Sequence, residues 1–437
     1  MIIAMKFAVL ADAHIGRRIP LAIAEHRRLA FKNGFSKAVD IIVEEGCDYV
    51  FLCGDLFERR TLKPELVQFA HDELYRIVDG TRSIWDKPVK IFLIRGNHDG
   101  RPQSDTLDYL KHPLAEYLHV FEEDSVPFVD ENLTVVGLNY YDRVEAAYTR
   151  LAEQALKEAS GLKIFMFHGF VAGYNKVPPY SSSLTLDRLA EADPAYVFTG
   201  HYHLNCGAKR LPNGGWILTP GSLEKYDFAE NPEKGLYIIE HGEDPRGAGG
   251  DTAYSPSKEP IFTWRSIEPL HIMKQVNIDS ERRRDPSWYS EQILEKVELF
   301  SSELAAADKS GYLRVRVRGS LRRGFVNEID QTKVDEIVKG DPRFLWLDVD
   351  TLGVEMPIAI VTPNGSPSEN LQEVIASFFL GFEDFAEDIG EMYVKAQEAL
   401  EETASEQTGL LTSSQRGPFV DEWVSRFEGR RFRRLEI

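Results

Sequence analysis

Five short polar clusters in the first half of the chain are built from residue types that ligate metal ions. Each cluster follows a short apolar run and offers histidine, aspartate or asparagine. They are Asp12 with His14 (ADAH), Asp55 (CGD), Asn97 with His98 (RGNHD), His168 (MFHG), and His201 with His203 (GHYH). Imidazole nitrogen mixed with carboxylate and amide oxygen suits Mn²⁺, Fe²⁺ or Zn²⁺ better than Ca²⁺ or Mg²⁺, which prefer oxygen alone.

Each cluster taken singly also has an ordinary structural explanation. An Asp-x-His after a strand is a common turn or cap, and Gly-Asp occurs at many strand ends. The sequence GNHD is harder to explain in this way, because a turn rarely requires Asn, His and Asp in succession. The five clusters together therefore favour a metal centre over five unrelated turns.

The elements that must position these clusters follow an α/β pattern. Up to about residue 240, short β-branched runs alternate with longer amphipathic stretches. A Gly-, Pro-, Ser- and charge-rich excursion at residues 241–260 is expected between two of the predicted strands, LYIIE and IFTWRSI. The other predicted strands are KFAVLAD, DYVFLCGD, VKIFLIRG, LTVVGLN, KIFMFHG and AYVFTGH. Several of them end in a polar cluster. Because α/β sheets place their sites at the carboxyl ends of strands, we expect the clusters to meet at one edge.

In this order, the clusters resemble the motifs of the calcineurin-like metallophosphoesterases: Asp-x-His, Gly-Asp, Gly-Asn-His-Asp/Glu, His and Gly-His-x-His. The resemblance implies an α/β fold, a two-sheet sandwich flanked by helices. It also implies two metal ions that share one aspartate. One ion would be held by Asp12, His14, Asp55 and His203, and the other by Asp55, Asn97, His168 and His201.

Such a centre has a clear chemical use. Two cations about 3.5–4 Å apart can clamp a phosphate, lower the pKa of a bridging water and stabilise the attacking and leaving oxygens. His98 stands beside Asn97 and is not needed for coordination. The ordinary imidazole pKa of about 6.5 suits proton donation to the leaving oxygen. The resemblance implies this role for His98, whereas the alternative is a hydrogen bond that only holds the turn.

A closer resemblance narrows the substrate. The segment PGSLEKYDFAE (residues 220–230), the following KGLYIIE and the segment GDLFERR (residues 54–60) are similar to those of SbcD-type nucleases, the prokaryotic relatives of the meiotic-recombination-eleven nuclease. The resemblance covers roughly residues 5–270. It implies a DNA exonuclease or endonuclease subunit for double-strand-break repair that uses two Mn²⁺ ions, with Fe, Mg or Zn as alternatives.

The sequence departs from this pattern at one position. Many members of the family have a second functional histidine immediately after GDLF, whereas this chain has Glu58. Bacterial members often lack that histidine too, so the departure leaves nuclease activity as a hypothesis. It leaves open the balance of exonuclease and endonuclease action.

From about residue 270 the pattern becomes strand, helix, strand, helix, strand, which predicts a small α+β unit. We expect domains at residues 1–269 (nuclease) and 270–360, the latter in the place of the family's DNA capping domain. In this unit Arg314, Arg316 and Arg318 alternate with apolar residues, so one strand face carries three guanidiniums. That face is predicted to meet phosphates. The alternative is a solvated face that protects the strand from aggregation.

Residues 366–437 are predicted to be helical, with a polar linker at 402–418 and an aromatic stripe from Leu371 to Tyr393. The resemblance implies that this region docks a coiled-coil ATPase of the SbcC type, although packing of the stripe onto the parent domain remains an equal alternative. No GxxxxGK[ST] motif occurs, so ATP dependence would come from that partner. The resemblance also implies a homodimer formed through helices near residues 63–79 and 105–118.

Composition sets further bounds on this 437-residue chain. Its net charge of −19 is unusual for a DNA-binding protein, but residues 309–323 contain six basic residues and no acidic one. Three cysteines without a CxxC spacing and the lack of a membrane-length apolar run favour a cytoplasmic, nucleoid-associated protein. Two other functions stay open, a phosphatase or cyclic-nucleotide phosphodiesterase, and a non-catalytic DNA or ATPase scaffold.

Overall fold

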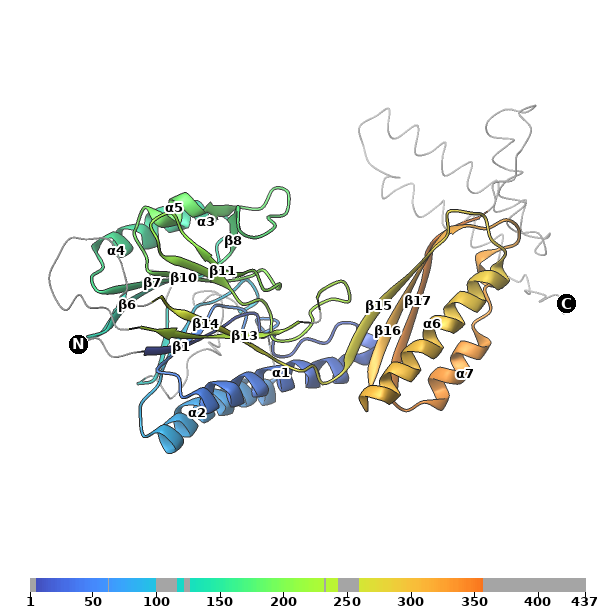
Figure 1. The fold of residues 1–437 in the computed structure, drawn as a ribbon, viewed down its shortest axis with the longest axis horizontal. Coiled ribbons are helices and arrows are strands. Elements are labelled where there is room, and N and C mark those ends of the chain that lie inside the picture. Colours follow the sequence, from blue (N-terminus) through green and yellow to red (C-terminus); the bar gives the residue numbers. More distant parts are fainter. Residues whose placement is uncertain are drawn as a thin grey trace, which may run out of the picture. The chain divides into compact units, whose positions relative to one another are not determined.

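The computed structural model describes residues 5–61, 63–99, 116–121, 126–231, 233–242 and 259–356 (Figure 1). Several sequence predictions fall outside these ranges. They are the helices and linker of residues 366–437, most of the excursion predicted at 241–260, and most of the helix predicted near 105–118. The helix predicted near 63–79 is present as α2 (Pro64–Trp85).

Two six-stranded sheets form the first part of the chain. In order across the first sheet the strands are β14 (Ile261–Ser266), β13 (Gly235–His241), β1 (Met5–Leu10), β2 (Tyr49–Leu52), β3 (Lys90–Leu93) and β4 (Leu118–Val120). Across the second they are β11 (Gly207–Arg210), β12 (Trp216–Thr219), β10 (Tyr196–Gly200), β7 (Leu162–His168), β6 (Leu133–Leu138) and β5 (Phe128–Val129). β1 to β4 run parallel, as do β6, β7, β10 and β12.

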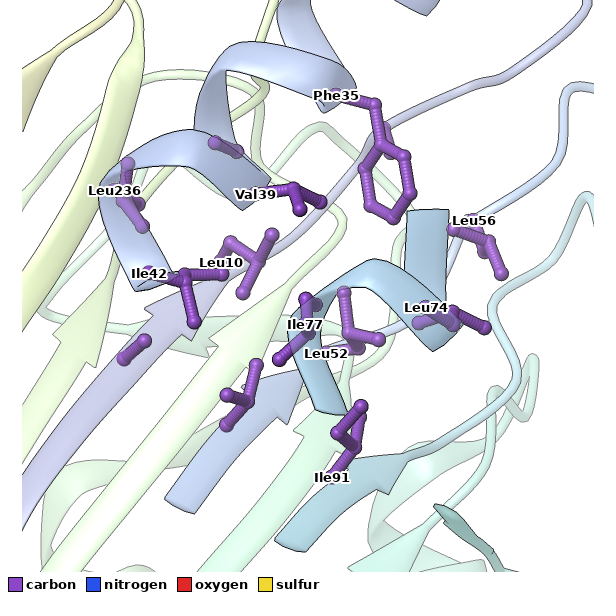
Figure 2. Packing of buried hydrophobic residues seen from close by; sticks show 14 of the residues in the cluster. Leu10, Phe35, Val39, Ile42, Leu52, Leu56, Leu74, Ile77, Ile91 and Leu236 are labelled. Carbon is purple, nitrogen blue, oxygen red and sulfur yellow. The ribbon is translucent and has the colours of Figure 1, made fainter. Parts of the chain in front are cut away.

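Both faces of each sheet are covered, which explains why the strands read as continuous apolar runs. In β1, Phe7 and Val9 lie in the core between the sheets, whereas Ala8 and Leu10 lie under helices. The first sheet is covered by α1 (Ala24–Glu45) and α2, and Figure 2 shows their side chains against those of the strands. The second sheet packs against α3 (Val144–Ala147), α4 (Glu153–Glu158) and α5 (Leu186–Ala190). The predicted two-sheet sandwich flanked by helices is confirmed.

Aromatic side chains fill the space between the sheets. The ring of Phe7 lies 5.7 Å from that of Phe51 in the same sheet and 5.8 Å from that of Tyr196 in the other. Phe51 in turn lies 4.9 Å from Phe198. These rings are fully buried, and close-packed protein interiors have a low compressibility. The loops at the strand ends therefore extend from a rigid base.

Six short strands were not predicted from the sequence. They are β4, β5, β11, β12, β8 (Phe170–Ala172) and β9 (Ser183–Thr185). β11, with the sequence GAKR, has no apolar run because it lies at the edge of its sheet and is partly exposed. β4, β5, β8 and β9 have only two or three residues, which leaves too few positions for an alternating pattern to be visible.

The second half of the described chain is a parallel three-stranded sheet of β15 (Ile272–Asp279), β16 (Gly311–Ser320) and β17 (Phe344–Glu355). Helices α6 (Pro286–Ala307) and α7 (Thr332–Gly340) connect these strands, so the predicted strand and helix order is confirmed. The buried positions of β16 are those of Leu313, Val315 and Val317, as the alternation predicts. Among the described residues, no helix has the length and apolarity needed to cross a membrane.

Candidate metal centre

The five polar clusters all lie at the carboxyl ends of parallel strands. Asp12 and His14 follow β1, Asp55 follows β2, and Asn97 follows β3, while His168 ends β7 and His201 follows β10. The first three strands belong to one sheet and the last two to the other. The structure therefore brings together residues that are up to 191 positions apart, from Asp12 to His203.

Within the centre the donor atoms fall into two sets. In the first, His14 Nε2 lies 3.1 Å from His203 Nε2 and 3.7 Å from Asp55 Oδ2. One ligand atom from each of Asp12, His14 and His203 lies within 4.8 Å of the others. The first set thus contains the residues that the sequence assigns to one ion.

The second set also includes Asp55. Its Oδ2 lies 3.3 Å from His168 Nε2. Asn97 Oδ1 lies 3.1 Å from His168 Nε2 and 2.9 Å from His201 Nδ1. All seven predicted ligands are therefore brought together, and Asp55 stands between the two sets.

The hydrogen bonds of His168 show that this donor set fits a cation. Its Nδ1 lies 2.8 Å from the carbonyl oxygen of Cys53, which can only accept, so Nδ1 carries a proton. In the neutral ring, Nε2 then directs its lone pair toward the oxygens of Asp55 and Asn97. His14 and His203 likewise turn Nε2 atoms toward each other. Donor atoms that face one another at about 3 Å are held together either by a shared proton or by a shared cation.

The backbone at the centre is strained. Four of the predicted ligands, Asp12, His14, Asp55 and His201, have positive φ angles of 52°, 45°, 52° and 81°. Residues with a Cβ atom rarely adopt this conformation, which costs on the order of 1–3 kcal/mol each. Strain of this kind gathers at functional sites, where the surrounding structure enforces it.

Glycines allow the loops of the centre to approach each other. A Cβ atom on Gly96 would lie 2.0 Å from Asp55 Oδ1, and one on Gly200 would lie 2.0 Å from the carbonyl oxygen of Cys53. Neither contact is possible for non-bonded atoms. The glycines of GNHD and GHYH are thus required because no Cβ atom fits at these two positions. The motif alone did not show this reason.

Replacing Gly96 with alanine is expected to displace the Asp55 carboxylate and so disturb both donor sets. Neither ion should then remain bound through gel filtration, as measured by elemental analysis. Overpacking should also lower the free energy of unfolding by about 1–3 kcal/mol. Gly340→Ala is the matched control, because nothing lies within 4 Å of the added atom. Two ions retained by Gly96→Ala would show that the loop can move aside.

Charges within the centre are balanced between carboxylate and imidazole. Burial would raise the pKa of Asp55, but the imidazoles of His168 and His14 hold it well below its usual range. Burial would likewise lower the pKa of His168, yet the Asp55 carboxylate raises it to about 9. Burial and the neighbouring His168 lower the pKa of His201 to about 3. A bound cation would take the place of the proton on His168.

His203 is oriented by a residue that the sequence did not single out. Its Nδ1 lies 3.1 Å from Glu230 Oε1. The other oxygen of Glu230 accepts hydrogen bonds from the backbone N–H of Tyr226, at 2.9 Å, and from Lys234 Nζ, at 2.8 Å. Although burial opposes ionisation, His203 and Lys234 lower the pKa of Glu230 to about 2. Glu230 ends the segment PGSLEKYDFAE, so the family resemblance marked the region but not the role.

His98 lies beside the centre and uses only one ring nitrogen for the turn. Its Nδ1 lies 2.7 Å from the carbonyl oxygen of Glu58, and its backbone N–H donates to Asp55 Oδ1 at 2.8 Å. Because a carbonyl only accepts, Nδ1 carries the proton of this bond. Nε2 is then the atom that can hold a transferable proton. The structural bond and the predicted donor role therefore use different atoms of the same ring.

Asp99, the last residue of GNHD, holds two loops together. Its carboxylate accepts hydrogen bonds from the backbone N–H groups of Gly96, Phe57 and Leu56, at 2.9, 2.8 and 3.3 Å. These groups lie after β3 and β2. Burial and the charge of Asp55 raise the pKa of Asp99 to about 6. Asp99 thus fixes the loop of Asn97 to the loop of Asp55 without being a predicted ligand.

The three arginines of β16 lie in another environment. Arg314 Nε donates to Asp348 Oδ2 at 2.7 Å, and Arg316 Nε lies 3.6 Å from Asp350 Oδ2. Both partners are on β17, directly opposite in the register. Arg318 faces Gly353 and is exposed. The predicted contact with phosphates stays a prediction, and it would have to compete with these ion pairs.

Comparison with known proteins agrees with this geometry. Residues 5–205 match the calcineurin-like phosphoesterase family. Residues 5–205 therefore form a calcineurin-like phosphoesterase domain, and three groups of His and Asp side chains among its described residues could hold metal ions.

Several curated relatives carry the name of the predicted group. The chain is 27% identical over 246 residues to the DNA double-strand break repair protein Mre11 of Archaeoglobus fulgidus, over 52% of each chain. It is 25% identical over 247 residues to Mre11 of Methanococcus maripaludis, over 54% of this chain and 62% of that protein. The chain thus spans about half the length of the curated relatives it matches, and the family resemblance is confirmed.

Among solved structures, the chain is similar to a dimetal phosphatase from Danio rerio. The two are 14% identical, the match covers 61% of this chain and 98% of that one, and the TM-score is 0.38. A score of this size does not by itself establish a common fold.

Proposed function

We propose that the chain is a Mn²⁺-dependent nuclease subunit that hydrolyses phosphodiester bonds of DNA during double-strand-break repair. The observation that supports this most is the sharing of Asp55 by two donor sets, with His98 beside them. Two sets that share a carboxylate suit a pair of ions at phosphoryl-transfer distance. The similarity to Mre11 proteins supports DNA as the substrate.

In this proposal the seven predicted ligands keep their assignments. Asp12, His14, Asp55 and His203 would hold one ion, and Asp55, Asn97, His168 and His201 would hold the other. When bound, the ions would clamp the phosphate and lower the pKa of a water molecule that attacks it. The mixed nitrogen and oxygen donors favour Mn²⁺, with Fe, Zn or Mg as alternatives.

The residues of the chain itself then have distinct tasks. His98 Nε2 holds the proton that the leaving oxygen requires, while Nδ1 fixes the ring to the Glu58 carbonyl. Asp55 positions His98 by accepting its backbone N–H. Glu230 holds the ring of His203. Asp99 keeps the loops after β2 and β3 in contact while substrate binds.

The test compares two substrates with the full chain and Mn²⁺. One is end-labelled linear duplex DNA and the other is a small chromogenic bis-phosphodiester. Cleavage of the DNA supports the nuclease proposal. Turnover of the small ester without DNA cleavage would indicate a phosphatase or cyclic-nucleotide phosphodiesterase instead. Inactivity on both, also with the ATPase partner added, would indicate a scaffold.

The proposal includes a partner and an assembly. We propose that residues 366–437 bind an SbcC-type coiled-coil ATPase and that the chain forms a homodimer in the cytoplasm. The similarity to Mre11 repair proteins supports this partnership. Deletion of residues 366–437 is expected to abolish co-purification with the ATPase. If the truncated chain still binds the ATPase, the contact lies elsewhere.

A DNA surface on β16 can be tested by neutralising Arg314 and Arg316 to glutamine. Neutralisation is preferable to charge reversal because Asp348 and Asp350 would repel a new carboxylate. If both arginines meet phosphates, the slope of log K against log salt should fall by about 2, since each contact contributes about 0.9. DNA binding is measured by fluorescence anisotropy at several salt concentrations.

The matched control removes the same charge elsewhere in the same unit. Lys333 and Lys339 are exposed on α7, and their double change to glutamine should leave the salt slope intact. An equal salt slope for wild type and the arginine variant would show that these arginines of β16 do not contact DNA phosphates.

A further inference from the structure

Glu58, the residue at which the sequence departs from many relatives, is buried beside the metal centre. Only 7% of it is exposed. One carboxylate oxygen accepts a hydrogen bond from Arg17 Nη1 at 2.8 Å, and the other lies 3.1 Å from His14 Nδ1. Its carbonyl oxygen accepts from His98 Nδ1 at 2.7 Å. A single residue therefore contacts both a predicted ligand and the predicted proton donor.

Arg17 holds this carboxylate in place. It is itself only 4% exposed, and its Nε donates to the carbonyl oxygen of Tyr226 at 3.1 Å. The guanidinium lies 3.1 Å above the centre of the Tyr226 ring. A buried charge is tolerated when it is paired and hydrogen-bonded, as here. Glu58 is thus fixed on one side by Arg17 and is not free to reach a substrate.

The backbone ties Glu58 to the loop that carries His14. The N–H of Glu58 donates to the carbonyl oxygen of Ile15 at 3.1 Å, and Ile15 also pairs with Phe57 in a parallel bridge. The ring of Tyr226 closes the other side, 4.7 Å from the ring of His14. The imidazole of His14 therefore lies between a fixed carboxylate and the donor atoms of the centre.

This arrangement favours one tautomer of His14, because Glu58 Oε2 and His14 Nδ1 are buried 3.1 Å apart and neither atom bonds to any other group of the described residues. A carboxylate at Nδ1 favours the ring form with the proton on Nδ1, which leaves the lone pair of Nε2 for a cation. His14 Nε2 is the atom that faces His203 and Asp55. A carboxylate behind a histidine ligand also makes the imidazole more basic and so a better donor.

We propose that Glu58, held by Arg17, is a positioning residue that orients His14 for one metal ion and anchors His98 through its carbonyl oxygen. The inference rests on the proposed two-metal function. It gives the position after GDLF a supporting role in this chain rather than a contact with substrate.

The experiment titrates the full metal-free chain with Mn²⁺ by calorimetry, in wild type and in Glu58→Gln. His14 belongs to only one donor set, so one of the two binding steps should weaken by about 10–100-fold and the other should not change. In the Zn²⁺-loaded protein labelled with ¹⁵N-histidine, the Nδ1–H signal of His14 should shift in the variant. Glu145→Gln, an exposed carboxylate on α3, is the control and should bind as wild type.

A second variant distinguishes the loss of the Glu58 carboxylate from an effect of misfolding. Glu58→Gln leaves Arg17 buried without its partner, so the double variant Arg17→Gln with Glu58→Gln removes both charges. It should unfold at about the wild-type temperature and still show the weakened step. Wild-type affinity for both ions in the two variants, with an unshifted His14 signal, would overturn the proposal. Because the titration needs no DNA, a wild-type chain that cuts no DNA even with the ATPase partner added would refute the nuclease function and leave the role of Glu58 to be decided by the titration.

Discussion

Replacing Asp55 with asparagine is expected to weaken binding of both metal ions and to lower phosphodiester cleavage by at least about 10³-fold, equal to roughly 4 kcal/mol. Asp55 Oδ2 faces His168 at 3.3 Å and His14 at 3.7 Å, so the lost charge belongs to both donor sets. Asparagine keeps the size of the side chain, which limits the change to charge. Calorimetric titration with Mn²⁺ and a cleavage assay measure the two effects.

An exposed aspartate provides the comparison. Asp335→Asn removes the same charge from the surface of α7 and should change neither metal binding nor cleavage. If Asp55→Asn lost only one ion, the shared position of this carboxylate would be disproved, and one donor set would have to be complete without it.

His98→Ala should have the opposite signature, with two ions retained and cleavage lowered by about 10²–10⁴-fold. The ring is held by the Glu58 carbonyl, and the backbone N–H of His98, which alanine keeps, donates to the Asp55 carboxylate. Removal of the ring therefore leaves the seven predicted ligands in place. Elemental analysis gives the metal content, and single-turnover cleavage of duplex DNA gives the rate.

A histidine with a packing role serves as the control. His119 packs its ring 4.6 Å from that of Phe121, and His119→Ala should keep the cleavage rate of wild type. Loss of metal from His98→Ala would make His98 a ligand rather than a donor. Full activity of His98→Ala would show that the only role of His98 is the hydrogen bond that holds the turn.

The sequence pattern predicted the α/β elements and the polar clusters at strand ends for one physical reason, whereas the two-sheet sandwich and the set of seven ligands followed from the family resemblance. Strands covered on both faces are apolar throughout, so β1, β2, β3, β7 and β10 are visible as runs that end in polar clusters. Parallel strands then place the clusters of each sheet at its carboxyl end, so the expectation of one edge was right for each sheet, while the meeting of the two sheets followed from the family resemblance. Neither step requires knowledge of contacts between distant residues.

The supporting residues could not be predicted because they depend on such contacts. Arg17 and Tyr226 are 209 positions apart, and Glu58 and His98 are 40 apart. No periodicity relates them. The pairing of Arg314 with Asp348 depends in the same way on the register of β16 against β17, which shifts between Gly311 and Tyr312. A one-residue difference in register would have left that arginine beside another partner.

The division of the predicted ligands between the two sheets would have a consequence for the lifetime of the protein. Asp12, His14, Asp55 and Asn97 come from one sheet, and His168, His201 and His203 from the other. Bound ions would cross-link the halves of the sandwich and stabilise the folded state by mass action. Openings that expose the inter-sheet aromatic core would then become rarer as metal supply rises. Cells starved of metal would hold a form that proteases degrade faster, so metal availability would set the abundance of the protein as well as its activity.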